Sequence, residues 1–270
     1  MAPGTEAVSA SDGDTLAQKN AKHFDNIAPG PWPQWVLDLH KQITDFLVSP
    51  DFSTWAGLPP SDIERRMLDY ACGDGLISKA LKPLFSSAIG VDVSSSMLEK
   101  YRSTASSLGL KLHEMMCVRG DLITDDAGPT EPPLNEEELH NFDLVAISMA
   151  LHHVQDPTSA MQKLACRLKS GGKLLVIDWA PVDGSTAAQR EYQAEVKRSG
   201  DKERIEEALR THAARHTVGK PEGFTRQEME ELFRSAGCCD VKWVLADRLS
   251  PVPVVQKAKG QLYWAIATKS

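Results

Sequence analysis

The sequence has few features that would place the protein in a membrane, in an oxidising compartment or on nucleic acid. Its five cysteines are odd in number and include no C-x-x-C pair, which argues against a disulfide framework and a structural zinc site. The net charge is −7 and there is no basic tract, so nucleic acid is disfavoured as the main partner. No apolar run is long enough to span a bilayer, and the first residues lack the regions of a signal peptide. We therefore expect a cytoplasmic protein with no membrane span and no metal site.

The 270 residues, of which 41% are hydrophobic, are enough for one sizeable α/β domain with a full core. The chain is organised around the stretch Arg66–Ile77, RMLDYACGDGLI. A short apolar run is followed by Gly73 and Gly75, after which apolar residues recur with helical spacing. This pattern predicts a strand, a tight glycine turn and a helix. Such a turn lets the backbone approach a ligand closely, and the helix N-terminus offers free N–H groups to it.

A second element supports a nucleotide site. The next predicted strand, Ala88–Val91, ends in Asp92, about 20 positions beyond the turn, where doubly wound sheets place the acid that binds ribose hydroxyls. A dinucleotide fingerprint would require a third glycine where this chain has Ser78, so the turn is poorly suited to bind the pyrophosphate of a dinucleotide.

The order Asp69-x-Ala-Cys-Gly-x-Gly, followed by Gly90–Val91–Asp92, resembles the first two motifs of class I S-adenosylmethionine-dependent methyltransferases, whose usual form is LD-x-G-C-G-x-G. The sequence departs from that form at Ala71, which costs little if its φ is negative and more if φ is positive. The resemblance covers about residues 63–268 and is to the ubiquinone-biosynthesis-like and fungal small-molecule branch. It implies a Rossmann-like, doubly wound, seven-stranded sheet with helices on both faces, and S-adenosylmethionine as the cofactor.

The resemblance also implies that the cofactor contacts lie at the ends of successive strands. In Arg119–Leu122, which resembles the third motif, Asp121 would accept a hydrogen bond from the adenine amino group and Leu122 would pack on the ring. A turn-capping aspartate is the alternative for Asp121, and plain packing is the alternative for Met97. The implied cofactor-binding residues are Asp69, Ala71, Cys72, Gly73, Gly75, Asp92, Val93, Met97, Asp121, Leu122, Ser148 and Met149.

The best acid–base candidates are His152 and His153, which directly follow the apolar strand predicted over Phe142–Met149. Similar histidine pairs occur in the family with different substrates, so a structural role for one of them stays open. Asp178 and Trp179 end the next predicted strand, where either side chain can shape the substrate pocket or remain solvated.

The flanking segments are expected to enclose the substrate. We expect residues 1–20 to form a disordered tail and residues 21–270 a single methyltransferase domain. Within it, residues 21–60 carry an N-terminal lid helix, in which Phe24 and Trp35 are either pocket residues or core aromatics. The charged, partly helical stretch 181–220 is interpreted as a substrate cap, a role that insertions here have in the family. The helix that follows it has a capping box at Thr225–Glu228.

We therefore expect a methyltransferase that moves a methyl group from S-adenosylmethionine to a hydroxyl, thiol or amine of a small molecule, such as a secondary metabolite. A thiolate acceptor would hardly need a base and would leave the histidines with binding duties. A protein methyltransferase with an acidic groove and a non-catalytic S-adenosylmethionine-binding regulatory protein stay open as alternatives. The sequence does not decide between a monomer and a homodimer.

Overall fold

The centre of the fold is an eight-stranded sheet, seen in a computed structural model that describes residues 13–59, 63–124, 130–211, 213–252 and 258–270. The strand order is β3-β2-β1-β4-β5-β8-β6, with the short β7 paired to β8. β1 to β5 are parallel, and β8 runs antiparallel to both β5 and β6. This confirms the doubly wound, seven-stranded sheet and adds one short strand that was not predicted. The strands are β1 Arg66–Tyr70, β2 Ser87–Asp92, β3 Met115–Arg119, β4 Phe142–Ser148, β5 Leu168–Ala180, β6 Cys238–Leu245, β7 Ser250–Pro251 and β8 Lys259–Lys269.

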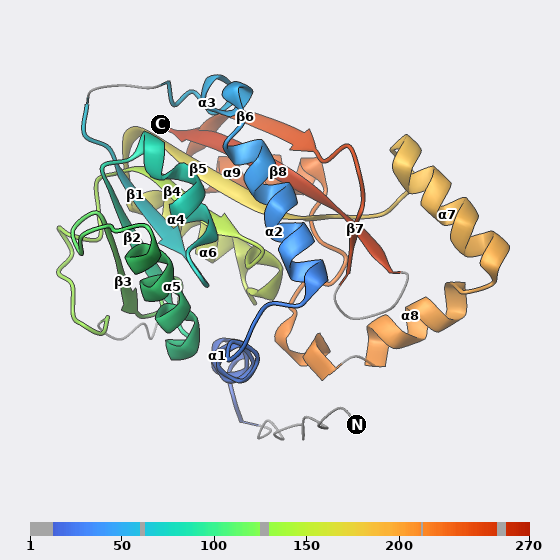
Figure 1. Ribbon diagram of the computed structural model, residues 1–270. Helices are drawn as coiled ribbons and strands as arrows, with labels where there is room; N and C mark the ends of the chain where they lie inside the picture. Colours follow the sequence, from blue (N-terminus) through green and yellow to red (C-terminus); the bar gives the residue numbers. More distant parts are fainter. Residues whose placement is uncertain (1–12, 60–62, 125–129, 212, 253–257) are drawn as a thin grey trace.

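Helices cover both faces of the sheet (Figure 1). α2 to α5 pack on one face, whereas α6 and α9 pack on the other. Within the described residues, no helix is long and apolar enough to cross a membrane. The α-helices are α1 Leu16–Ile27, α2 Gln34–Leu47, α3 Pro50–Ala56, α4 Leu76–Leu81, α5 Ser95–Ser107, α6 Pro157–Cys166, α7 Ala187–Ser199, α8 Lys202–Thr211 and α9 Arg226–Ser235. Short 3₁₀ helices are η1 Lys82–Leu84, η2 Leu151–His153 and η3 Ala213–Thr217.

Near-continuous apolar runs form the central strands because both of their faces are buried. Leu68 and Val145 point into the core under α6 and α9, whereas their neighbours Met67 and Leu144 point into the core under α2 to α4. All four side chains are fully shielded from solvent. This is the pattern expected of parallel strands at the centre of an α/β sheet.

Polar side chains at the predicted positions cap the helices. Ser94 Oγ accepts from the Met97 N–H at 3.1 Å at the start of α5. Thr225 and Glu228 form the predicted reciprocal capping box at the start of α9.

Ordered structure begins earlier than the expected boundary near residue 20. Helix α1 starts at Leu16, where Thr15 and Gln18 form a capping box that the sequence interpretation missed. The first 12 residues of the expected tail lie outside the described residues.

The third strand, β3, begins at Met115, directly after a turn over Lys111–Glu114. The backbone N–H of Glu114 donates to the Lys111 carbonyl at 2.9 Å, and the Glu114 carboxylate accepts from the Lys111 N–H at 3.0 Å. These two bonds close a turn and delay the strand.

The Gly171–Gly172 pair lies inside β5, beyond the end of α6. A side chain at Gly172 would approach the Phe142 carbonyl oxygen to 2.9 Å. Glycine is therefore required there for close strand packing.

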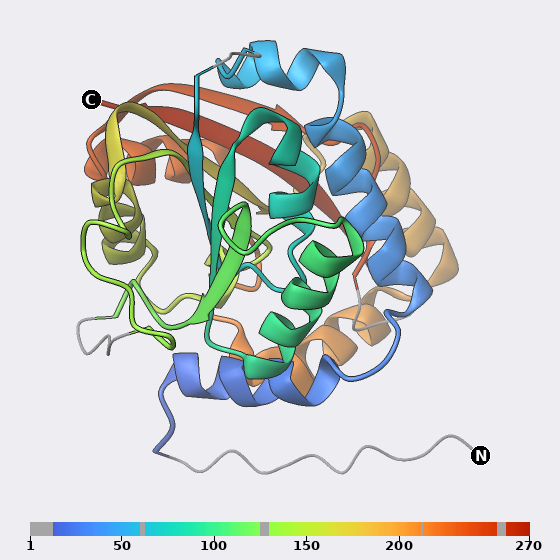
Figure 2. The ribbon, with the colours of Figure 1, turned by 60° about the vertical axis from the view of Figure 1, so that its left-hand side comes forward.

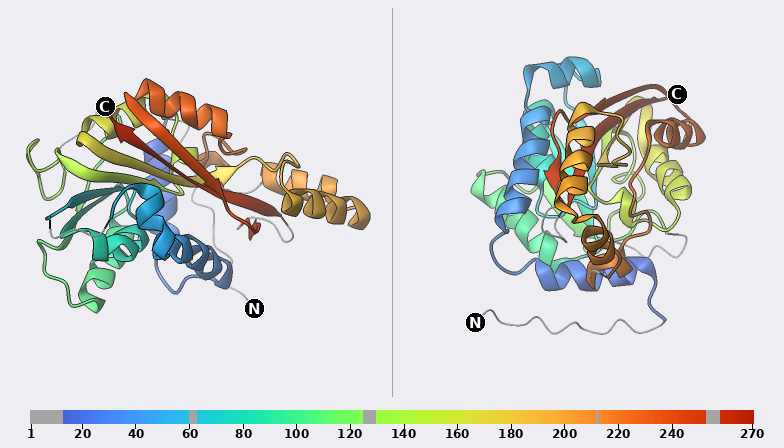
Figure 3. Two further views of the ribbon diagram at one scale, coloured as in Figure 1. Left: turned by 90° about the horizontal axis from the view of Figure 1, so that it is seen from above. Right: turned by 90° about the vertical axis from the view of Figure 1, so that its right-hand side faces the viewer.

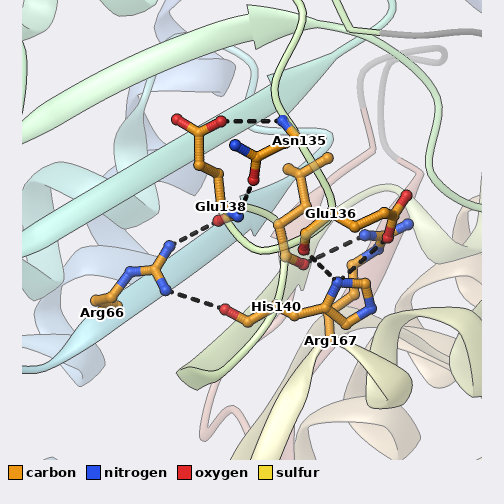
Figure 4. Close-up of polar contacts among 7 residues, drawn as sticks. Arg66, Asn135, Glu136, Glu138, His140 and Arg167 are labelled. Carbon is orange, nitrogen blue, oxygen red and sulfur yellow. Dashed lines mark hydrogen bonds and ion pairs between the residues drawn. The ribbon is translucent and has the colours of Figure 1, made fainter.

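A polar cluster at the N-terminal edge of the sheet holds the acidic segment that precedes β4 (Figure 4). Arg66 donates to the carbonyl oxygens of His140 and Glu138, at 3.0 and 2.6 Å, and Arg167 donates to the Leu139 carbonyl at 3.2 Å. Parallel strands place their ligand sites at the opposite, C-terminal edge, so this cluster fixes a connection away from the candidate site.

Candidate active site

A cavity of about 2,560 Å³ extends over the C-terminal ends of the parallel strands. The helix α1 lies across this end of the sheet (Figure 2), and α7 and α8 project beside it (Figure 3). Residues of all three helices and of α2 line the cavity. The volume exceeds the roughly 300–1,000 Å³ that usually holds one small ligand, so there is room for two.

The glycine turn between β1 and α4 forms part of the cavity wall. Ala71, Gly73 and Gly75 all have positive φ, of 54°, 51° and 83°. Ala71 stands where the usual motif has glycine, and its positive φ makes this replacement the more costly of the two cases considered in the sequence analysis. At Gly75 the positive φ favours glycine, because an L side chain would be strained in this conformation and would also crowd the Met115 side chain. Cys72 and Gly73 line the cavity, whereas the wall does not include Gly75.

Asp69 borders the cavity from beneath and orients the turn. Its Oδ2 accepts from the backbone N–H and the hydroxyl of Ser78, at 3.0 and 2.7 Å, which ties the end of β1 to α4. Tyr101 donates to the same Ser78 hydroxyl at 2.9 Å. Burial raises the pKa of the Asp69 carboxyl to about 7.

Asp92 joins the glycine turn to the next βα unit. Its two oxygens accept from the N–H groups of Gly73, at 2.9 Å, and Ser94, at 2.8 Å. Burial raises the pKa of this carboxyl, and its hydrogen bonds to Ser94, Gly73 and Val93 partly offset that effect. Asp92, Val93 and Met97 all line the cavity.

Asp121 lines the cavity at the end of β3, and Leu122 does not. Asp121 Oδ1 accepts from the Tyr70 hydroxyl at 2.9 Å and from the Ile123 N–H at 3.0 Å. Leu122 is buried in the hydrophobic core. Among the expected residues after β4, both Ser148 and Met149 line the cavity.

His152 lines the cavity with a buried carboxylate behind it. Its Nδ1 lies 2.6 Å from Asp178 Oδ1, and its backbone N–H donates to Asp178 Oδ2 at 3.0 Å. Asp178 is fully buried and lies outside the cavity wall, so its side chain neither lines the pocket nor is solvated, the two alternatives left open for it. Its neighbour Trp179 does line the cavity.

His153 contacts α1, which begins the N-terminal segment interpreted as a lid, and the segment interpreted as a substrate cap. Its Nδ1 lies 2.7 Å from the Thr217 carbonyl oxygen, so the ring donates there. The Phe24 ring of α1 packs edge-on against it, with the centroids 5.5 Å apart. Burial, together with the neighbouring His152, holds the pKa of His153 well below its usual range. A neutral, bonded ring at this position fits a docking role for His153.

The lid is fixed by residues that the sequence analysis missed. Asp25 of α1 accepts from the Ser94 hydroxyl and the Ser96 N–H, at 2.7 and 3.0 Å, at the start of α5. Asn20 donates to the His153 carbonyl at 3.3 Å. α1 therefore bridges the cavity from α5 to η2. The capping box at the start of α1 is the sequence feature that could have located this helix.

A second missed contact joins the lid to the glycine turn. Trp32 Nε1 donates to Asp74 Oδ2 at 2.7 Å, and Lys100 lies over the Trp32 ring at 4.6 Å. Both expected aromatics, Phe24 and Trp35, line the cavity.

The far wall is built by the segment interpreted as a cap. Apolar and aromatic side chains of α7 and α8 line the cavity, namely Tyr192, Val196, Ile205 and Leu209. Within the described residues, no cluster of three or more His, Cys, Asp or Glu side chains could hold a metal ion.

Comparisons with known proteins place the chain in a family. A family model described as a methyltransferase domain matches residues 41–242. An uncharacterized methyltransferase of Schizosaccharomyces pombe is 29% identical over 197 residues, which cover 73% of this chain and 57% of that protein. A ubiquinone biosynthesis O-methyltransferase of Coxiella burnetii is 30% identical over 110 residues, 41% of this chain and 42% of the relative. The chain thus spans about half the length of the curated relatives it matches.

Solved structures share the fold at low sequence identity. The magnesium protoporphyrin IX methyltransferase of Synechocystis, with bound S-adenosylmethionine, is similar with a TM-score of 0.57 and 13% identity, covering 97% of this chain and 100% of that one. The phosphoethanolamine N-methyltransferase 2 of Haemonchus contortus has a TM-score of 0.52 and 16% identity, covering 94% of this chain and 57% of that one. With the family model spanning most of the chain, this protein belongs to the class I S-adenosylmethionine-dependent methyltransferases.

Proposed function

We propose that this protein transfers the methyl group of S-adenosylmethionine to a hydroxyl group of a small molecule. The observation that carries the proposal is that His152, with Asp178 behind it, lines the same cavity as the glycine turn. One volume therefore holds the elements for both the methyl donor and an acceptor that must lose a proton.

The donor half of the cavity suits a nucleoside with a positively charged amino-acid arm. Three strand-end carboxylates, of Asp69, Asp92 and Asp121, border it beside the open glycine turn. A side chain placed on Gly73 would meet nothing within 4 Å, so the turn leaves space for a ligand. In this proposal Asp92 binds the ribose hydroxyls and Asp121 binds the adenine amino group. When bound, the cofactor supplies an electrophilic methyl group whose sulfur is already a good leaving group.

The wall of the same cavity also carries aromatic side chains. Those of Phe24, Trp35, Trp179 and Tyr192 suit a flat or hydrophobic acceptor held in line with the donor. Nδ1 of His152 faces a carboxylate and so carries a hydrogen, which leaves Nε2 as the nitrogen able to take a proton. A hydroxyl needs such a base far more than a thiol does.

A basic peptide is a poorer fit. The cavity side of the cap carries Lys197 and Lys202 as well as Glu203 and Glu206. A methyltransferase that acts on a basic peptide would be expected to bind it in a groove lined mainly by acidic side chains. The mixed charges do not supply that attraction.

The first test is calorimetric titration with S-adenosylmethionine and S-adenosylhomocysteine, with NAD as the control ligand. We expect the wild type to bind both sulfur nucleosides and not NAD. Asp92→Ala should lose this binding, because the carboxylate also holds Gly73 and Ser94 in place. The exposed Asp51, in the first turn of α3, gives a matched control, Asp51→Ala. Failure of the wild type to bind either compound would refute the proposal.

The acceptor is then sought by following S-adenosylhomocysteine formation with panels of phenols, thiols and amines. The proposal predicts turnover with members of the phenol panel and a dependence of that turnover on His152. Turnover confined to amines, and indifferent to His152, would contradict the hydroxyl assignment while keeping the cofactor assignment intact.

A further inference from the structure

Tyr70 occupies an unusual position between two cofactor-binding strands. It is the last residue of β1, and its register partner on β2 is Val91, which in turn pairs with Val118 on β3. The three side chains belong to the same hydrophobic cluster, so Tyr70 extends over β2 towards the end of β3. There its hydroxyl donates to Asp121 Oδ1 at 2.9 Å.

This contact fixes which oxygen of Asp121 is available. Oδ1 already accepts two hydrogen bonds, from the Tyr70 hydroxyl and the Ile123 N–H at 3.0 Å. Two donors on one oxygen satisfy its lone pairs and stop the carboxylate from rotating. Within the described residues Oδ2 accepts no hydrogen bond, and Asp121 lines the cavity.

Tyr70 is a hydrogen-bond donor at neutral pH. Burial, followed by the charge and the hydrogen bond of Asp121, raises the pKa of Tyr70 well above its usual value. The phenol therefore keeps the hydrogen that it donates to Asp121.

We propose that Tyr70 is a positioning residue that sets Asp121 to recognise the 6-amino group of adenine. The assignment rests on the proposed function, because it takes the bound nucleoside to be that of S-adenosylmethionine. A fixed oxygen opposite an N–H donor distinguishes adenine from a purine that lacks the amino group. Such selectivity needs the carboxylate to be oriented before the ligand arrives.

The test compares two ligands by calorimetry: S-adenosylhomocysteine and its purine analogue, in which hydrogen replaces the 6-amino group. The wild type should prefer the amino compound by about tenfold or more, as for a hydrogen bond to a charged group. Tyr70→Phe should weaken the binding of S-adenosylhomocysteine about fivefold and leave the binding of the purine analogue unchanged. The loss of selectivity, and not the loss of affinity alone, is the diagnostic result.

Tyr263→Phe is the matched control. Tyr263 is likewise fully buried in the sheet, but its hydroxyl has no hydrogen-bond partner within the described residues. Tyr263→Phe thus removes a buried phenolic oxygen from the same sheet and leaves Asp121 undisturbed. We expect the wild-type preference between the two ligands to persist in this variant.

A second variant, Asp121→Asn, tests the orientation without changing Tyr70. The two donors at Oδ1 would hold the amide oxygen in that place and point its N–H₂ at the ligand. The preference should then shift at least tenfold towards S-inosylhomocysteine, whose 6-oxygen accepts a hydrogen bond.

The outcomes separate the two proposals. If Tyr70→Phe weakens the binding of both ligands equally, or leaves the preference between them unchanged, the positioning role is overturned while the cofactor assignment stands. An Asp121→Asn protein that shows no shift towards the 6-oxo ligand also overturns it. A wild type that binds none of these ligands overturns the proposed function, and the role of Tyr70 with it.

Discussion

Nδ1 of His152 lies 2.6 Å from Oδ1 of Asp178, and the other carboxylate oxygen accepts the backbone N–H of the same histidine. The carboxylate thus holds both the ring and the chain that carries it. It is fully buried and also accepts from the Trp179 N–H at 2.7 Å. A fixed ring with its hydrogen on Nδ1 keeps the Nε2 lone pair ready to take a proton. This pair is the strongest structural argument for a hydroxyl acceptor.

His152→Gln should lower kcat with a phenolic acceptor by about 10²-fold or more, because glutamine cannot take the proton. Binding of S-adenosylmethionine should be unchanged, since no cofactor contact is assigned to His152. The measurement is steady-state methyl transfer over a range of pH, compared with calorimetric binding. The slow-down should be much smaller with a thiol acceptor, which ionises without help.

His153→Gln serves as the comparison because it changes the neighbouring ring, which donates to the Thr217 carbonyl. We expect it to raise KM for the acceptor, by loosening Phe24 and the lid, with little effect on kcat. Equal losses of kcat in the two variants would show that neither histidine is the base.

A second prediction concerns Ala71, which has a φ of 54°. An L-residue in the left-handed region is strained by about 1–2 kcal/mol, whereas glycine is not strained but loses about 0.5–1 kcal/mol of chain entropy. Ala71→Gly should therefore stabilise the protein by at most about 1.5 kcal/mol in urea unfolding. Ala71→Val should destabilise it, because a β-branched side chain fits this region less well. A glycine variant that is clearly less stable than the wild type would contradict the strain argument.

The sheet and its nucleotide-binding edge could be predicted because local patterns determine them. Asp92 ends β2, Asp69 is the residue before the end of β1 and Asp121 lies just beyond β3; parallel strands bring these ends to one edge. Their partners could not be predicted, since the bond from Tyr70 to Asp121 joins positions 51 residues apart and depends on strand order. The role of Asp178 was missed for the same reason, as only the fold puts it behind His152.

The lid was only partly predictable. Val36, Leu39 and Ile43 form the buried apolar face of α2, and their helical spacing can be recognised in the sequence. The helix α1 has a polar sequence with a single buried residue, Asn20, so its periodicity predicts little burial. Tertiary contacts, such as the one from Asp25 to the start of α5, hold it in place.

A third prediction concerns the contact from Trp32 to Asp74, with Nε1 and Oδ2 2.7 Å apart. Trp32→Phe removes this bond between the lid and the glycine turn while keeping an apolar ring. A hydrogen bond to a charged group contributes roughly 1.5–3 kcal/mol, so release of S-adenosylhomocysteine should accelerate about tenfold. Stopped-flow dissociation measures this rate. The control is Trp55→Phe, in α3, which does not line the cavity and should leave the rate unchanged.

The last prediction follows from Asp69, whose pKa burial raises to about 7 from a usual value of 3.8. Between these values the folded protein keeps a proton that the unfolded chain has released, so its contribution to stability falls as the pH rises from about 4 to about 7. Asp69→Asn removes this dependence. The free energy of unfolding of the variant, minus that of the wild type, should therefore rise by up to about 4 kcal/mol from pH 4 to pH 8. Urea unfolding at several pH values measures the difference, with Asp45→Asn, an exposed carboxylate paired with Lys41, as the control. A difference between Asp69→Asn and wild type that stays constant with pH would show that the carboxylate is ionised in the folded protein, held charged by its two hydrogen bonds from Ser78.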